Sequence, residues 1–251
     1  MKQLNLNICG SDRTKATYDE VLAVETPQKT ETWTPIGHGF LIEQTRKHLD
    51  ENGFDIVDEN HNLARFGQRY FGLMQVQDRT APENADRATI VGLRNGHDKC
   101  FPAGIMAGDA PFVCSNLIFN NEIVIARRHT KNIDNINVAG NIFMKIANAI
   151  GKLRESWIGQ EKRVNAYKEY DLGSNKEAND LIIRAYQSGA CSKTQIADIV
   201  EQWNKPNHNE FADRNLYSLY NSFSEVWKGN LGLLPARSTS LHSLFDATAE
   251  A

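Results

Sequence analysis

Residues 69–93 read RYFGLMQVQDRTAPENADRATIVGL, and this stretch indicates the fold. Aromatic and β-branched residues dominate its two ends, while Pro82, Glu83 and Asn84 between them favour a turn. Similar short apolar runs occur at 54–57, 100–101, 105–106, 112–114 and 122–126. Turns are expected between the runs, at residues 60, 95–96, 108–109 and 120–121. Short strands joined by such turns predict an antiparallel meander.

Helical patterns flank this meander on both sides. A helix is expected at about residues 39–52, with Gly53 as its C-terminal cap. Apolar residues recur every three to four positions over residues 138–170, which predicts one long amphipathic helix on the sheet. Further helices are expected at 176–187, after a capping box at Ser192, after a cap at Asp213, and at 240–247. The predicted fold class is α+β: an antiparallel β meander, a long helix packed on it and a helical C-terminal part.

The order of these elements divides the chain into three parts. Residues 1–38 are expected to form an N-terminal arm, because they are polar and broken by Pro27 and Pro35. Residues 39–170 make up the α+β core, and residues 171–251 a helical C-terminal subdomain. A chain of 251 residues is long enough to bury a sizeable core.

The composition is that of an ordinary globular protein. Hydrophobic residues make up 41% and charged residues 24% of the chain. Neither a long apolar run for crossing a membrane nor a secretion signal is visible, so cytoplasmic localisation without membrane contact is expected. The four cysteines are widely spaced and form no Cys-x-x-Cys pair, which favours reduced thiols over a zinc ribbon.

Positive charge is concentrated in the middle of the chain. Residues 1–60 hold 6 basic and 11 acidic side chains, whereas residues 111–170 hold 9 basic and 5 acidic ones. A local basic surface of this kind can attract phosphates although the whole chain has a net charge of −3. The predicted nucleic-acid contacts are Arg127, Arg128, Lys131, Lys152 and Arg154, with a second basic-aromatic cluster at residues 65–71, in which Arg69, Tyr70 and Phe71 are the predicted contacts. The alternative is a solvated helix face, with Tyr70 and Phe71 alternating between core and surface.

Three short motifs, at residues 94–98, 112–116 and 127–132, contain residue types that are used in catalysis. Cys114 with His97 or His129 has the residue types of a thiolate–imidazole pair, which Asp98 or Asn116 would orient. A cysteine that follows Phe-Val is, alternatively, a small buried apolar residue. The histidines are too scattered for a metal site, and the glycine-rich stretch at 101–108 lacks the Gly-Lys-Ser/Thr ending of a phosphate loop. The sequence therefore predicts no enzyme, no cofactor and no metal.

Four segments carry a resemblance to a known family: Val91–Asp98, Phe112–Asn116, Arg128–Thr130 and Leu216–Glu225. Together they resemble the phage- and plasmid-borne family called domain of unknown function 932. The resemblance implies a mobile-element context without an assigned reaction. The order of a helix, a meander and a long basic helix is also similar to single-strand annealing proteins, an analogy at the level of the fold.

The basic cluster, the analogy with annealing proteins and the mobile-element context together favour a phage-type single-stranded DNA-binding protein. Annealing or recombination as a homo-oligomer in the host cytoplasm is the role that the analogy implies. Host or phage replication and defence proteins are further expected partners. The alternative is a non-enzymatic host-interaction protein that inhibits a host defence component through an acidic face at residues 43–59.

Overall fold

The computed structural model describes residues 13–81, 87–100, 102–111, 118–126, 144–228 and 233–250. Within them, six strands form one sheet, and each strand pairs antiparallel with the next one in the chain. The strands are β1 (Arg13–Ala16), β2 (Phe54–Ala64), β3 (Arg69–Asp78), β4 (Arg87–Gly96), β5 (Ala103–Pro111) and β6 (Ile118–Ala126). The predicted antiparallel meander is thereby confirmed.

Helices precede and follow the sheet, as the predicted α+β class requires. The α-helices are α1 (Tyr18–Leu22), α2 (His38–Glu51), α4 (Leu153–Glu169), α5 (Asn175–Gln187), α6 (Ile196–Asn204), α7 (Leu216–Trp227) and α8 (Leu234–Ala249). Two short 3₁₀ helices are η1 (Lys193–Gln195) and η2 (Asn209–Phe211). Residues 144–151 are also helical, and a turn at Lys152 separates them from α4. We call residues 144–169 the α4 rod.

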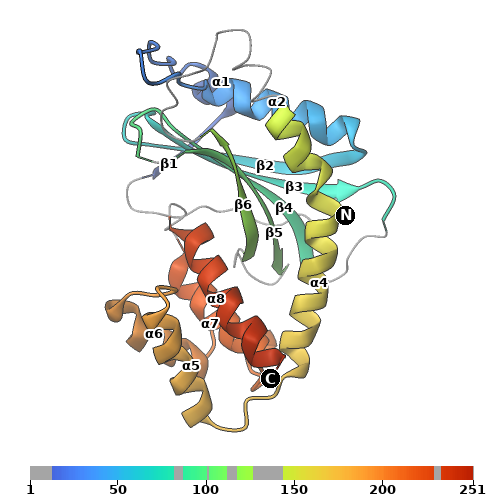
Figure 1. The fold of residues 1–251 in the computed structure, drawn as a ribbon, viewed down its shortest axis with the longest axis vertical. Coiled ribbons are helices and arrows are strands. Elements are labelled where there is room, and N and C mark those ends of the chain that lie inside the picture. The colour runs from blue at the N-terminus through green and yellow to red at the C-terminus, as the bar shows by residue number, and fades with distance from the viewer. Residues whose placement is uncertain are drawn as a thin grey trace.

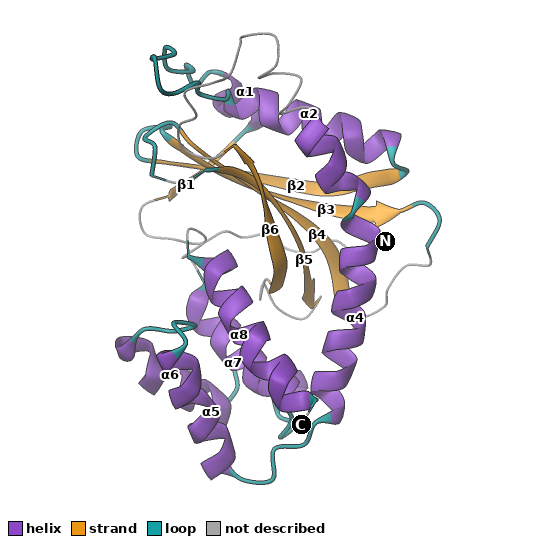
Figure 2. Ribbon diagram, in the orientation of Figure 1, coloured by secondary structure: helices purple, strands orange, loops and turns teal. Residues whose placement is uncertain are grey.

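The elements are stacked in layers around the sheet. Figure 1 shows α1 and α2 on one side of the sheet and α5 to α8 on the other. The α4 rod runs along the side of the molecule and joins the two helical layers, as the colouring by secondary structure makes plain (Figure 2). The rod therefore connects both layers along one side of the sheet.

Alternating side chains of the strands feed two separate cores. Phe71 and Leu73 of β3 pack with the C-terminal helices, in a core that includes Phe223 and Phe245. Met74 of β3 points to the opposite face and packs with α2 and residues 146–153 of the rod. Because a strand places successive side chains on opposite faces, β3 is buried from both sides.

The two cores also cross the predicted domain boundaries. Val21 and Ile36 of the N-terminal segment belong to the same core as α2. Leu181 and Phe223 of the C-terminal helices share a core with Phe71 of the sheet. The segments on either side of residues 38 and 170 are thus packed against one another in the described structure.

Several strands are longer than predicted. The expected turns at Asn60, at Asn95–Gly96, at Gly108–Asp109 and at Asn120–Asn121 all lie within strands. Polar residues are tolerated there because partners in the fold satisfy them: Asn62 donates to Asn60, and Arg87 forms an ion pair with Asp109. These turn predictions were wrong for that reason.

Helix ends follow local chemistry where it is strong. Ser192 and Gln195 form the predicted capping box, and Ser174 caps α5. Asp213 was predicted to cap α7, but Asn215 does so, with its side chain accepting from the Ser218 amide. The last helix begins at Leu234 rather than at Ser240, with a proline in its first turn.

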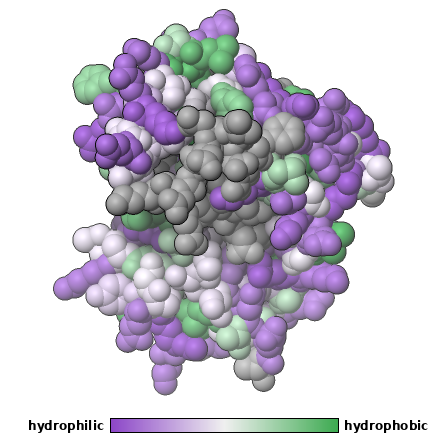
Figure 3. All heavy atoms as spheres, turned by 45° about the horizontal axis from the view of Figure 1, so that its top comes forward, coloured by the Kyte–Doolittle hydropathy of each residue, from purple (hydrophilic) through white to green (hydrophobic). Residues whose placement is uncertain are grey.

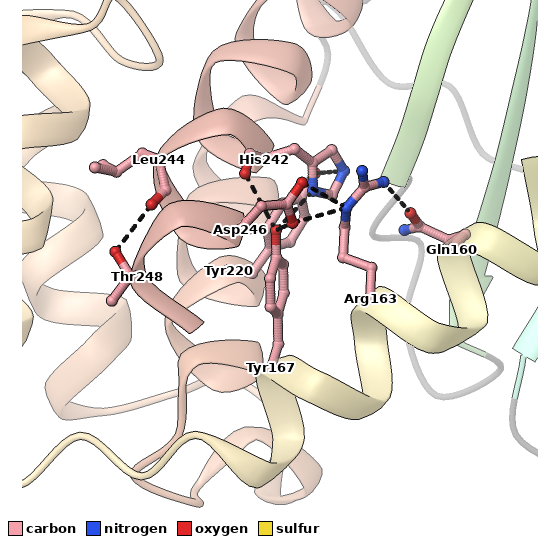
Figure 4. A network of polar contacts seen from close by, with 8 residues as sticks. All are labelled: Gln160, Arg163, Tyr167, Tyr220, His242, Leu244, Asp246 and Thr248. Atoms are coloured by element: carbon pink, nitrogen blue, oxygen red, sulfur yellow. Dashed lines mark hydrogen bonds and ion pairs between the residues drawn. The ribbon is translucent and has the colours of Figure 1, made fainter. Parts of the chain in front are cut away.

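A buried polar network ties α8 to α4 and α7 (Figure 4). The Tyr167 hydroxyl of α4 donates to Asp246 of α8 at 2.6 Å, and Arg163 Nε donates to the same carboxylate at 2.9 Å. The ring of His242 is stacked on Tyr220 with 4.9 Å between their centroids. Burial and the Asp246 carboxylate raise the pKa of Tyr167, so its hydroxyl stays protonated and remains a donor. The network fixes the far end of the rod.

Candidate functional site

Part of the predicted site cannot be placed. The following predicted residues lie outside the described residues: Arg127, Arg128, Lys131, Cys114, Asn116 and His129. The basic strand-to-helix junction and the thiolate–imidazole pair therefore remain predictions. The other predicted residues all lie in described strands, turns and helices.

The basic-aromatic cluster on β3 is not a base-stacking surface. Tyr70 is 0% and Phe71 3% exposed, so neither ring offers a face to a nucleotide. Arg69 is held by Asp98 through its Nε and lies 2.9 Å from the Cys100 sulfur through Nη2. The prediction for these three residues was wrong, because β3 lies inside the sheet and both of its faces are covered.

Arg154 and Lys152 of the rod, predicted together, have different environments. Arg154 forms an ion pair with Asp78, donates to the Asn52 carbonyl at 2.8 Å, and lies 4.6 Å above the ring of Phe54. Its hydrogen bond lowers the pKa of Asp78 to about 2, so the carboxylate stays charged. Arg154 thus joins α4 to the corner between α2, β2 and β3, and its charge is already balanced. Its assignment as a phosphate contact is corrected accordingly.

Exposed lysines supply the accessible positive charge of the rod. Lys145, Lys152 and Lys162 are exposed, and none of them forms an ion pair with a residue in the described ranges. The Lys168 ammonium lies 5.3 Å above the ring of Tyr217. Arg163, in contrast, is bound to Asp246. The arginines of the rod therefore hold the fold together, whereas Lys145, Lys152 and Lys162 face solvent.

A cavity of about 470 Å³ lies between the rod and the ends of β3, β4 and β5. Trp157 and Val164 contribute apolar walls, and the indole of Trp157 donates to the Gly108 carbonyl at 2.9 Å. Three cations and three carboxylates line it: Arg87, Arg154, Lys168, Asp78, Asp109 and Glu161. Equal numbers of both signs leave no net charge there to attract a polyanion.

Arg87 is the most deeply set of these charges. It forms an ion pair with Asp109 at 2.7 Å and donates to the Tyr217 hydroxyl at 2.6 Å. Tyr217 lies 130 residues further along the chain, so the pair links the sheet to α7. The position of this cluster indicates a structural role at the base of the cavity.

His97 belongs to a buried cluster with His38 and Asn95. The two imidazoles are stacked, with centroids 3.9 Å apart and planes at 6°. His38 Nε2 lies 2.9 Å from the Gly67 carbonyl, so this nitrogen carries the proton, and Nδ1 accepts from the Asn95 amide at 3.0 Å. His97 Nε2 is likewise bonded to the Ile36 carbonyl at 2.8 Å. Asp98 was predicted to orient an imidazole, but its carboxylate binds Arg69 and the Cys100 amide.

Both histidines are held in the neutral form. Burial lowers the pKa of His38 to about 4, with a further contribution from the neighbouring His97. Burial also lowers the pKa of His97. Two neutral rings can stack in contact, whereas two charged rings would repel each other.

This cluster predicts a loss of stability in mild acid. An unfolded histidine titrates near pH 6.5, so the unfolded state binds the proton of His38 first as the pH falls. The free energy of unfolding should therefore decrease from pH 6.5 toward pH 4, by about 3 kcal/mol in total for His38. Urea unfolding between pH 5 and 6.5 measures this slope, and comparison with a His38 variant removes the contribution of glutamates that begin to protonate near pH 5. His38→Gln should flatten it, whereas His208→Gln, outside the cluster, serves as the control. An unchanged slope in His38→Gln would contradict the assignment.

The acidic face at residues 43–59 is largely engaged within the fold. Glu59 forms an ion pair with Arg46, and Asp50 and Asp55 both bind Arg79. The Glu43 carboxylate accepts from the Tyr18 hydroxyl at 3.0 Å. These contacts leave this surface less negative than its sequence indicates, which weakens the case for it as a docking face.

The position of Phe66 at a turn and one ion-pair cluster were not predicted from the sequence. Phe66, at the turn between β2 and β3, is fully exposed and has a φ of 56°. The Arg87–Asp109–Tyr217 cluster joins residues that are far apart in the chain, so no local pattern signals it. The Arg-Phe-Gly-Gln sequence at 65–68 is the one signal available for the turn, since glycine favours left-handed backbone.

The described residues contain no group of three or more His, Cys, Asp or Glu side chains arranged to hold a metal ion. Within the same residues, no helix has the length and apolar character needed to cross a membrane. Comparisons with protein-family models, with curated proteins and with solved structures found no match.

Proposed function

We propose that the protein binds single-stranded nucleic acid along the solvent-facing side of the α4 rod. The observation that supports this proposal is the set of exposed lysines, Lys145, Lys152 and Lys162, which have no carboxylate partner in the described ranges. Such lysines can replace the cations condensed on the phosphates of a nucleic acid. The release of these cations is the main source of affinity for nucleic acid. Arg127, Arg128 and Lys131 precede the rod in the sequence and add to the positive charge of this part of the chain.

The dimensions of the rod suit an extended strand. α4 alone has 17 residues and is about 25 Å long at 1.5 Å per residue. Gly151 precedes the turn at Lys152, and Gly159 lies seven residues after it. An added Cβ at either glycine would meet nothing within 4 Å. A backbone could approach the helix closely at both glycines. The preference for a single strand is implied by the analogy with annealing proteins.

Glu155, Glu161 and Glu169 stand on the same rod and reduce its positive charge. The expected binding is therefore weak at physiological salt and stronger at low salt. Without a stacking platform on β3, the affinity should depend on phosphates more than on base identity.

Charge reversal of two lysines tests the proposal. Lys152→Glu combined with Lys162→Glu should weaken binding to a single-stranded oligonucleotide about tenfold at low salt, and should reduce the salt slope by about 1.4. Fluorescence anisotropy titrations at several salt concentrations measure both quantities. Because both side chains are exposed, the double variant should keep the stability of the native chain.

A matched control separates a local effect from a change in total charge. Lys193→Glu combined with Lys205→Glu makes the same change on exposed positions of the C-terminal helices. The proposal requires this control to bind like the native chain, apart from a small loss through long-range repulsion. Equal losses in both double variants would show that the rod is not the contact surface.

A further inference from the structure

The turn between β2 and β3 presents an aromatic side chain to solvent at a conformational cost. Phe66 has a relative exposure of 107%, the highest among the large apolar side chains described as exposed. Arg65 and Phe66 both adopt left-handed backbone, with φ of 53° and 56°, which disfavours residues with a Cβ. Strain of this kind, combined with an exposed ring, points to a use for the ring outside the fold. On the face of the molecule that Figure 3 shows, hydrophilic residues predominate and apolar residues lie in small groups.

The turn is held rigidly in place. The Gly67 carbonyl accepts from His38 Nε2 at 2.9 Å, and the Gln68 carbonyl accepts from the His97 amide at 2.7 Å. A Cβ built on Gly67 would lie 3.1 Å from a methyl carbon of Val24, so the turn packs closely against the segment after α1. The backbone that carries Phe66 is thus fixed before any partner arrives, which reduces the entropy lost on binding.

A cavity of about 470 Å³ opens beside this ring. We call it the hairpin cleft. Phe66, Val24 and Pro27 are its apolar lining residues, and His97, Glu20 and Glu25 are polar ones.

His97 brings a hydrogen-bond acceptor to the hairpin cleft. It is 7% exposed, and its Nε2 proton is used by the Ile36 carbonyl. In a neutral imidazole the other nitrogen, Nδ1, must then be an acceptor. Nδ1 has no hydrogen-bond partner among the residues that the structure describes. Because His97 lines the hairpin cleft, a donor supplied by a ligand there can bond to this nitrogen.

The charged residues of the hairpin cleft favour a positively charged ligand. Two carboxylates, Glu20 and Glu25, line the cleft, and no lysine or arginine does. Glu20 is engaged by the Thr17 amide and hydroxyl in a capping box, whereas Glu25 is exposed and forms no ion pair within the described ranges. Phosphates would be repelled, and a cation that donates hydrogen bonds would be attracted.

We infer that the hairpin cleft binds an arginine side chain of a partner protein. The planar guanidinium stacks on the ring of Phe66 and still has donors left for His97 Nδ1 and for the Glu25 carboxylate. A lysine ammonium has the charge but lacks the planar face and the fork of donors. The apolar walls at Val24 and Pro27 accommodate the aliphatic stem. The hairpin cleft contains no residue of the α4 rod, so the proposal of arginine binding can be tested independently of nucleic-acid binding.

Titration of the full chain with acetyl-Gly-Arg-Gly-amide tests the inference. The ring resonances of His97, followed by NMR, should shift in a saturable way, and the equivalent lysine and citrulline peptides should bind at least about fivefold more weakly. Citrulline keeps the planar shape of arginine and removes its charge. Phe66→Ala and Glu25→Gln should each weaken the arginine peptide about fivefold, whereas Arg65→Gly should change its affinity less than about twofold. The Arg65→Gly control relieves the left-handed strain and keeps the ring of Phe66.

Three results would overturn the inference. Equal affinity for the citrulline peptide would show that charge is not recognised. Unchanged affinity in Phe66→Ala would remove the ring from the site. A larger shift of His97 with a single-stranded oligothymidine than with the arginine peptide would assign the hairpin cleft to nucleic acid instead.

Discussion

Gly72→Ala should destabilise the protein by about 3 kcal/mol, because β3 has no room for a methyl group at this position. A Cβ built on Gly72 would lie 2.0 Å from the hydroxyl oxygen of Tyr70 and 2.8 Å from its ring carbon Cζ. The ring cannot move aside easily, since Tyr70 is 0% exposed and its hydroxyl is bonded to His61 Nδ1 at 2.9 Å. Either the tyrosine or the strand must shift, and both belong to the core under α2.

Urea unfolding measures this loss, and two further variants make the result specific. Gly159→Ala changes the same group on the open side of α4, where a Cβ would meet nothing within 4 Å. Because alanine favours a helix over glycine, this control should gain about 0.5–1 kcal/mol. Tyr70→Phe combined with Gly72→Ala removes the closest contact and should recover part of the loss. If Gly72→Ala unfolds at the same urea concentration as the native chain, the placement of Tyr70 over Gly72 is wrong.

Arg87→Met should cost about 3–5 kcal/mol, the typical effect of breaking a buried ion pair from one side. Asp109 is 9% exposed, and its carboxylate would be left without the guanidinium that lies 2.7 Å away. The variant also loses the donor to the Tyr217 hydroxyl and with it the link between the sheet and α7. The free energy of unfolding in urea at pH 7 is the quantity to compare.

The double variant separates an unpaired charge from lost packing. Arg87→Met combined with Asp109→Asn should be more stable than Arg87→Met alone, since no uncompensated charge remains. Arg79→Met is the exposed control: Arg79 pairs with Asp50 and Asp55 at the surface, and its loss should cost less than about 1 kcal/mol. A double variant that is no more stable than Arg87→Met would refute the ion pair as the source of the effect.

Local patterns were sufficient for much of the fold. Apolar residues on one side of residues 39–52 located α2, short apolar runs joined by turns predicted the antiparallel meander, and the Ser192–Gln195 capping box located the start of η1. The residues at which strands begin and end were harder to predict. Asn60 and Asp109 look like turn residues in the sequence, yet Asn62 and Arg87 satisfy them within the sheet. Such partners become visible only when the register of the strands is known.

The site was harder to predict than the fold, for a related reason. Arg154 and Lys152 are two residues apart and equally basic, but Asp78, 76 positions before Arg154, engages only one of them. Tyr70 and Phe71 combine aromatic and basic neighbours as a stacking platform would, and burial on both faces of β3 removes that possibility. The role of a charged or aromatic side chain thus depended on contacts distant in the sequence.

Affinity of the native full chain for nucleic acid, measured against salt concentration, is the most direct test of the central claim. We expect a single-stranded oligonucleotide to bind measurably at low salt, with the logarithm of the affinity falling linearly as the logarithm of the salt concentration rises. The proposed preference for a single strand requires duplex DNA of the same length to bind more weakly, and tighter binding of the duplex would contradict that preference. An RNA strand shows whether the sugar matters. No detectable binding of any of the three at low salt would contradict the proposed function.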